Sequence, residues 1–173
     1  MGRKGSLPID TSLVVRDSHL RLITMVPVKN MFLGEFQHIL DTKGRLAIPA
    51  KFRTNLALGA VVTRGFDSSL ILFPLEEWGK LASKIASLPL GQVESRAFAR
   101  LLLSGAADVS IDRQGRIIIP EYLRTWAKLE KEVVVAGLYN RIEIWNADLW
   151  YTSQQKAMED LGGIAEKLSE YGI

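Results

Sequence analysis

The stretch DTKGRLAIP at residues 41–49 returns as DRQGRIIIP at residues 112–120. The similarity extends outward on both sides, with matched pairs at Gly34 and Gly105, Arg53 and Arg124, Gly65 and Gly137, and Trp78 and Trp150. Similarity at a fixed spacing is typical of one structural unit used twice. The chain is therefore organised as two copies of one module.

Each copy of the motif has the pattern of a tight hairpin. In the first copy, residues 36–40 alternate apolar and polar side chains and residues 46–48 form a short apolar run, so both segments are predicted strands. Between them, Asp41 can accept hydrogen bonds from the backbone that follows it, and Gly44 can adopt the positive φ that closes a turn. Residues 107–119 repeat the pattern.

The same further elements follow in both copies. A short helix begins at Pro49 and again at Pro120, because proline suits the first helical position. A second hairpin follows in each copy, at residues 61–73 and at residues 133–145. A longer helix then follows, after Pro74 in the first copy and after Asn146 in the second. The order is therefore strand, strand, helix, strand, strand, helix, twice. Residues 92–103 are a further predicted helix, which bridges the copies.

A final amphipathic helix is expected from Ala147 towards Leu168, with an interruption at Gly162 and Gly163. Its predicted inward positions are Trp150, Ala157, Met158 and Leu161.

We predict a β-rich α+β fold with this order of elements. A hairpin pair this small can hardly bury both of its faces alone. The two copies should close on one another as a single pseudo-twofold barrel. The predicted division is an extension at 1–30, repeat 1 at 35–79, a connecting helix at 88–104, repeat 2 at 105–150 and a C-terminal helical segment at 151–173.

The charge is unevenly placed along the 173 residues. Residues 1–30 hold five of the 22 basic and two of the 19 acidic residues, so the rest is neutral with 17 of each. We interpret residues 1–30 as an upstream extension, with Met31 as the natural start; the alternative is a basic arm that contacts DNA phosphates. The absence of cysteine fits a reducing cytoplasm. Residues 1–30 hold no apolar run long enough for a signal peptide or membrane span.

Local basic patches coincide with the two motifs. Only Asp41 offsets Lys43, Arg45, Lys51 and Arg53, and only Asp112 and Glu121 offset Arg113, Arg116, Arg124 and Lys128. An arginine beside a protruding hairpin can form two hydrogen bonds with a guanine edge in the major groove, which admits a two-stranded ribbon. We expect Arg45 and Arg116 to contact bases, and the phosphate contacts to come from Lys43, Lys51, Arg113 and Arg124. The alternative is structural: the aspartates cap the turns and form ion pairs with the arginines.

The D-x-x-x-R spacing of Asp41 to Arg45 and of Asp112 to Arg116, each followed by Ile-Pro, resembles the MraZ family, as does the opening at 32–36. That family is related to the AbrB and MazE regulators and antitoxins. The resemblance covers residues 31 to about 170 and departs from the family at the extension. These four motif residues match the family's aspartates and arginines.

The resemblance implies an AbrB-like swapped-hairpin or double-split β-barrel, cyclic homo-oligomers and a cytoplasmic, nucleoid-associated location. It also implies repression of the division and cell-wall gene cluster, including the protein's own promoter, through short G-rich direct repeats in double-stranded DNA. We expect no cofactor, metal, membrane or small-molecule ligand.

Two other classes of function are weaker. An enzyme would need catalytic residues that the sequence does not offer: His19 and His38 are its only histidines, and the pair Glu76 and Glu77 suits the start of a helix. A protein-interaction module of antitoxin type would resemble one half of the barrel with an acidic tail, whereas this chain has two complete halves.

Overall fold

The computed structural model describes residues 31–172, so both proposals for the extension at 1–30 fall outside it. The elements, in chain order, are β1 (Phe32–Ile39), β2 (Arg45–Ala47), α1 (Ala50–Arg53), η1 (Thr54–Leu56), β3 (Ala60–Arg64), β4 (Leu70–Pro74), α2 (Leu75–Ala86), α3 (Val93–Leu103), β5 (Ala107–Val109), β6 (Arg116–Ile118), α4 (Glu121–Trp126), β7 (Glu132–Tyr139), β8 (Arg141–Asn146), α5 (Ala147–Glu159), α6 (Leu161–Leu168) and η2 (Ser169–Tyr171). The mixed α+β class and the repeated element order are confirmed.

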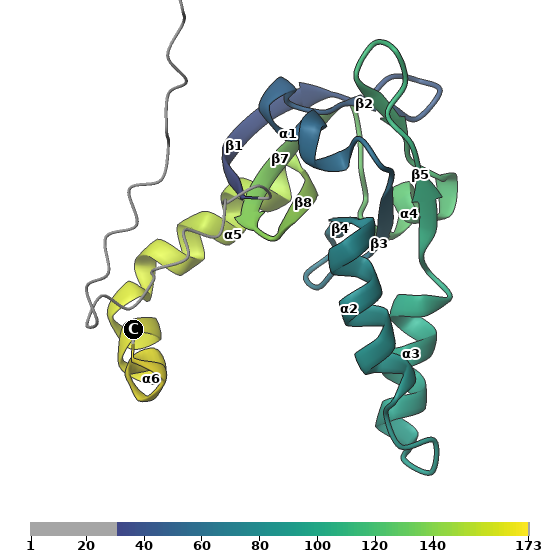
Figure 1. The fold of residues 1–173 in the computed structure, drawn as a ribbon. Helices are drawn as coiled ribbons and strands as arrows, with labels where there is room; N and C mark the ends of the chain where they lie inside the picture. The colour runs from purple at the N-terminus through teal and green to yellow at the C-terminus, as the bar shows by residue number, and fades with distance from the viewer. Residues whose placement is uncertain (1–30, 173) are drawn as a thin grey trace, which may run out of the picture.

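The strands of the two copies are interleaved within one antiparallel sheet. Its order is β1-β7-β8-β4-β3-β5 (Figure 1). The equivalent strands of the two copies are β1 and β5, β3 and β7, and β4 and β8, and exchanging them gives the same order read from the other end. Strand β1 of the first copy pairs along its whole length with β7 of the second. At the other end, β5 of the second copy pairs with β3 of the first. Neither copy could therefore form this sheet alone.

A separate two-stranded ribbon consists of β2 and β6, one strand from each copy. This pairing corrects the predicted hairpin partners. The turns at 41–44 and 112–115 do close, but β1 and β2 share only the bridge between Leu40 and Leu46. The backbone of Leu40 donates to Lys131, because the hydrogen bonds of β1 are directed to β7. The turn was predicted correctly, and the strand partner was wrong.

The core lies between the ribbon and the inner face of the sheet. Leu46 and Ile117 point inward from the ribbon, and Phe52 and Leu56 add the buried face of α1 and η1. The outer face of the sheet is covered by helices: α5 packs on β7 and β8, and α2 and α3 pack against β3 and β4. In Figure 1 these helices extend from the sheet as two arms, α2–α3 and α5–α6.

The break in the C-terminal arm lies at Asp160, two residues before the predicted glycines. Asp160 has a non-helical backbone, and its side chain occupies the space that a Cβ on Gly163 would need. Gly162 and Gly163 lie inside α6, and the lack of a side chain at Gly163 makes room for the aspartate.

The predicted inward face of this arm is only partly correct. Trp150 is buried against Trp145, and Ala157 is half-buried. Met158 and Leu161 are instead 73% and 65% exposed, because the arm leaves the sheet before these residues are reached. Among residues 31–172, no helix has the length and apolar character that crossing a bilayer would require.

Candidate nucleic-acid interface

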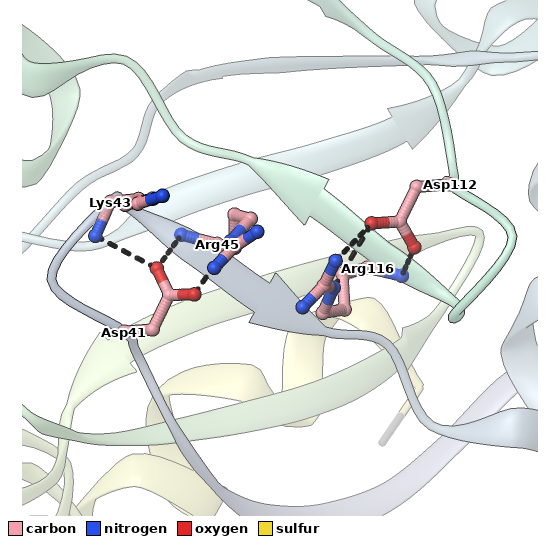
Figure 2. Close-up of polar contacts among 5 residues, drawn as sticks. All are labelled: Asp41, Lys43, Arg45, Asp112 and Arg116. Carbon is pink, nitrogen blue, oxygen red and sulfur yellow. Dashed lines mark hydrogen bonds and ion pairs between the residues drawn. The ribbon is translucent and has the colours of Figure 1, made fainter.

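The outer face of the β2–β6 ribbon carries both motif arginines. Arg45 lies opposite Ile118, and Ala47 lies opposite Arg116. Residues that face each other across antiparallel strands point to the same side, and residues two apart on one strand do so too. These four side chains therefore share one face, while Leu46 is buried on the other. Figure 2 shows the two arginines between the two aspartates, which lie towards opposite ends of the ribbon.

Asp41 holds the first turn with both of its carboxylate oxygens. Oδ1 accepts hydrogen bonds from the backbone N–H groups of Lys43 and Arg45, each at 2.9 Å. Oδ2 accepts from Nε of Arg45 at 2.6 Å. These contacts lower the pKa of Asp41 below its usual value; the backbone N–H of Arg45 contributes most, followed by its side chain. The carboxylate thus closes the turn and orients the arginine.

Asp112 repeats this arrangement in the second turn. Its Oδ1 accepts from the backbone N–H groups of Gln114 and Arg116 at 2.8 and 2.9 Å. Its Oδ2 accepts from Nε and Nη2 of Arg116 at 3.0 and 2.8 Å. The pKa of Asp112 is also lowered, here mainly by the side chain of Arg116. Both the turn cap and the ion pair that the sequence left as the structural alternative are therefore present.

The ion pairs leave donors available on the outer face. Within residues 31–172, the side chain of Arg45 bonds through Nε, so its two Nη groups can still donate to a ligand. Arg116 retains Nη1. About a third of each side chain in the Asp41–Arg45 pair is exposed, so the pair contributes little to stability by itself. Its effect is to fix where the remaining donors point.

Each turn is also held by an arginine from the other copy. Arg124 lies against the turn at Gly44, and its Nε donates to the carbonyl of Ile119 at 3.1 Å. Arg53 lies in the same way against the turn at Gly115, with Nε donating to the carbonyl of Ile48 at 2.8 Å.

The backbone reinforces this exchange between the copies. Ile48 donates to Gly115 at 2.9 Å, and Ile119 donates to Gly44 at 2.8 Å. Sequence reasoning included Arg124 among the DNA contacts but not Arg53, although the match between the two copies pairs them.

The other predicted phosphate-binding residues are more scattered. Lys43 and Arg113 are exposed within the two turns, beside the ribbon face. Lys51 differs: its ammonium lies 4.7 Å from the centre of the Phe36 ring, over the β1 side of α1. The structure therefore brings Lys43 and Arg113 to the ends of the ribbon and places Lys51 against β1.

The acidic pair that the sequence raised has a structural partner, and His38 is half-buried on β1. Glu76 and Glu77 both bind Lys80, each at 2.7 Å, at the start of α2. Partial burial lowers the pKa of His38, and the charge of Arg53 adds to the effect. Within residues 31–172, no three His, Cys, Asp or Glu side chains gather as a metal site.

The fold and the site together define a class: an α+β protein of two interleaved repeats, whose paired Asp–Arg turns flank a shared two-stranded ribbon. A family model described as "MraZ protein, putative antitoxin-like" matches residues 31–101 and again residues 102–168. This chain belongs to the MraZ family.

Individual relatives agree with the family model. A protein from Herpetosiphon aurantiacus is 47% identical over 143 residues, which are 83% of this chain and 100% of the relative. One from Roseiflexus castenholzii is 49% identical over 140 residues, 81% of this chain and 98% of the relative. One from Pediococcus pentosaceus is 46% identical over 143 residues, 83% and 100% of the two chains. Each of these three relatives is named "Transcriptional regulator MraZ".

Proposed function

We propose that this protein is a sequence-specific DNA-binding transcription regulator that places the outer face of the β2–β6 ribbon in the major groove. The observation that carries the proposal is the presence of Arg45 and Arg116 on one exposed face, each oriented by its own aspartate. The major groove is wide enough for a two-stranded ribbon, and arginine pairs well with the O6 and N7 atoms of guanine. The names of the relatives support the regulatory role.

In this proposal the basic residues divide into two groups. Arg45 and Arg116 contact base edges, since their donors project from the middle of the ribbon. Lys43 and Arg113 contact phosphates on either side, since they lie in the flanking turns. Asp41 and Asp112 act by positioning the arginines. Arg124 and Arg53 hold the turns from behind, and Lys51 adds a phosphate contact on the β1 side.

The targets follow from the resemblance to the family. We propose that the protein represses the division and cell-wall gene cluster, including its own promoter, by binding short G-rich direct repeats. One ribbon offers few contacts, so a single repeat should be bound weakly and with strong salt dependence. Several ribbons in one assembly would bind several repeats with a higher effective affinity. In this view the protein acts in the cytoplasm at the nucleoid, without catalysis.

We also propose that the interleaved strands form the swapped-hairpin, double-split barrel expected from the resemblance. The pairing of β1 with β7 and of β2 with β6 supports this, because each hairpin strand is completed by the other copy. Such a barrel presents the two turns as one rigid unit.

Assembly into a ring is proposed from the two arms. Met158 and Leu161 expose apolar surface on the C-terminal arm, and α6 buries none of its residues. Near the other arm, a cavity of about 390 Å³ opens between α2, α3 and the sheet, with Phe66 at its edge 58% exposed. We propose that the C-terminal arm of one chain packs into this cavity on the next chain of the ring. A head-to-tail contact of this kind closes into a ring when its rotation allows.

The test of DNA binding uses the full chain and a labelled duplex from upstream of its own gene. Arg45→Ala and Arg116→Ala should each weaken specific binding by roughly tenfold to a hundredfold, and the double variant should abolish it. Arg45→Lys keeps the positive charge but lacks the planar guanidinium that forms two hydrogen bonds with guanine, so it should also lose specific binding.

The matched control is Arg100→Ala, which removes an exposed arginine from α3, away from the ribbon. It should bind like the wild type at two salt concentrations. Light scattering checks that every variant keeps the same assembly. If the Arg45 and Arg116 variants bind normally, the motif is only a turn framework and the proposal is wrong.

An interaction module of antitoxin type is the second candidate, because the family description contains that word and the C-terminal arm exposes apolar side chains. Purification from the native host distinguishes the two. A stoichiometric small protein partner would favour the antitoxin function, whereas specific binding to the upstream DNA favours the regulator.

A further inference from the structure

Ile118 is an apolar side chain exposed in the middle of the ribbon face. It is 62% exposed, whereas its neighbours Ile117 and Ile119 are buried in the core. Exposed apolar residues are common on protein surfaces and often need no explanation. The position of this residue is what distinguishes it.

Ile118 lies directly across the ribbon from Arg45 and two residues along β6 from Arg116. Its side chain is therefore on the same face as both guanidinium groups and next to each of them. Any base pair that Arg45 contacts brings a neighbouring base edge close to Ile118.

The equivalent position in the first copy is Ala47, which lies across from Arg116 and is half-buried. The two halves of the ribbon face therefore match in their arginines but differ in the apolar residue beside them. A side chain with three fewer carbon atoms has less reach towards a groove floor. Any selectivity that depends on this position should come from the β6 side alone.

We propose that Ile118 is a specificity-determining residue that contacts the 5-methyl group of a thymine beside the base bound by Arg45. This inference rests on the proposed function. The thymine methyl group is the apolar feature of the major groove, and apolar side chains are the ones that contact it. Each ribbon then requires one thymine on the Ile118 side and makes no such demand on the Ala47 side.

The test replaces the thymines of the upstream duplex by deoxyuridine, one at a time, which removes only the methyl group. In each DNA repeat bound by one ribbon, replacement at one thymine position should weaken binding of the wild type by about fourfold. This is the effect of losing one buried methyl group. Ile118→Ala should weaken binding to the thymine duplex by a similar factor and should be insensitive to deoxyuridine at that position.

Ile39→Ala is the matched control, since Ile39 is an exposed isoleucine on β1, outside the ribbon. It should keep both the affinity and the deoxyuridine penalty of the wild type. Light scattering must give the same mass for all variants; a changed mass for Ile118→Ala places this residue in a subunit contact and overturns the inference.

Three further outcomes would count against the inference or against the proposed function on which it rests. If Arg45→Ala abolishes binding but no deoxyuridine substitution matters, the DNA-binding function stands and the role of Ile118 is wrong. The role is also wrong if Ile118→Ala keeps the full deoxyuridine penalty. If the wild type does not prefer its upstream duplex over unrelated DNA, the proposed function itself fails.

Discussion

Each motif aspartate performs two tasks with two different oxygen atoms. In Asp41, Oδ1 accepts from the backbone that forms the turn, while Oδ2 binds the side chain of Arg45. The first task could be met by any turn-capping residue, but the second needs a negative charge. The spacing of four residues in the motif follows from this geometry, because one short side chain must contact both the turn and the arginine that ends it.

The pH dependence of stability should show the charge of these aspartates. Their folded-state pKa values are lowered, so the charged form stabilises the fold at neutral pH. This stabilisation is fully present above the unfolded aspartate pKa of about 3.9 and is lost as the pH falls through the lower folded value. An Asp41→Asn, Asp112→Asn double variant keeps the turn caps but not the ion pairs, so it should be slightly less stable than the wild type at pH 7, as expected for partly exposed pairs.

Urea unfolding at a series of pH values measures the difference between the two proteins. It should shrink as the pH falls below about 4, where the wild type loses the same charges. A difference that stays constant with pH would show that the charges contribute nothing to folding.

Gly44 is required by its backbone and by its neighbours. Its φ is +75°, and a Cβ there would lie 2.9 Å from both the carbonyl oxygen of Ile119 and Nε of Arg124. Gly44→Ala should therefore reduce the free energy of unfolding by about 1–3 kcal/mol.

The control for this change is Gly79→Ala in α2, where an added Cβ meets no atom within 4 Å. There alanine should stabilise the protein by about 0.5–1 kcal/mol, because it favours the helix. Urea unfolding measures both variants. Equal effects at the two positions would contradict the packing that we describe at Gly44.

At the scale of elements, the sequence predicted the types of element better than their partners. The period of the apolar residues and the turn residues are local signals, and they correctly predicted the strands, the short helix after Pro49 and the longer helix after Asn146. Strand pairing depends on the other copy. Because the two copies have similar strands, β2 could pair within its own copy or with β6, and the sequence pattern is the same for both.

The candidate site shows the same limit. The repeated motif indicated Arg45 and Arg116, but not that the two would share one face, since this follows from the pairing of β2 with β6. Arg53 was missed as part of the site although its counterpart Arg124 was included, and each of the two lies against the turn of the other copy. The sequence did not single out Ile118, which stands in an apolar run between two buried isoleucines. Alternation on a strand only three residues long is too brief to reveal it.

The junction of β8 and α5 offers a test at this scale. The side chain of Asn146 accepts a hydrogen bond from the backbone of Leu149 at 3.2 Å and donates one to the carbonyl of Lys128 at 2.9 Å. Asn146→Ala should cost about 1–2 kcal/mol of unfolding free energy, since it removes a helix cap and a buried hydrogen bond.

The control is Gln92→Ala, because Gln92 stands at the same position before α3 without a capping hydrogen bond from its side chain. It should change stability by less than about 0.5 kcal/mol. Thermal unfolding followed by circular dichroism compares the two. A similar loss in both variants would mean that the cap of α5 has no particular importance.

At the scale of the whole molecule, the ribbon and the arms are separate parts of the surface. The ribbon carries the guanidinium groups that we propose as donors to DNA, while the arms extend from the sheet and expose apolar side chains. If the arms join separate chains head to tail, each chain needs two different surfaces. One lies near Leu161 on α6, and the other lies near Phe66 beside α3. Such a contact differs from a twofold contact, in which one surface binds itself.

Mixing two variants tests this arrangement directly. Leu161→Arg and Phe66→Arg should each reduce the assembly to monomers, because each places a charge in the apolar contact. Mixed together, they should form a dimer and nothing larger, since each variant keeps one intact surface that fits the other. Leu58→Arg, which alters another exposed leucine, should leave the assembly unchanged. Light scattering gives the mass in each case. If the mixture stays monomeric, or if Phe66→Arg still forms the full assembly, the contact is not head to tail between these surfaces.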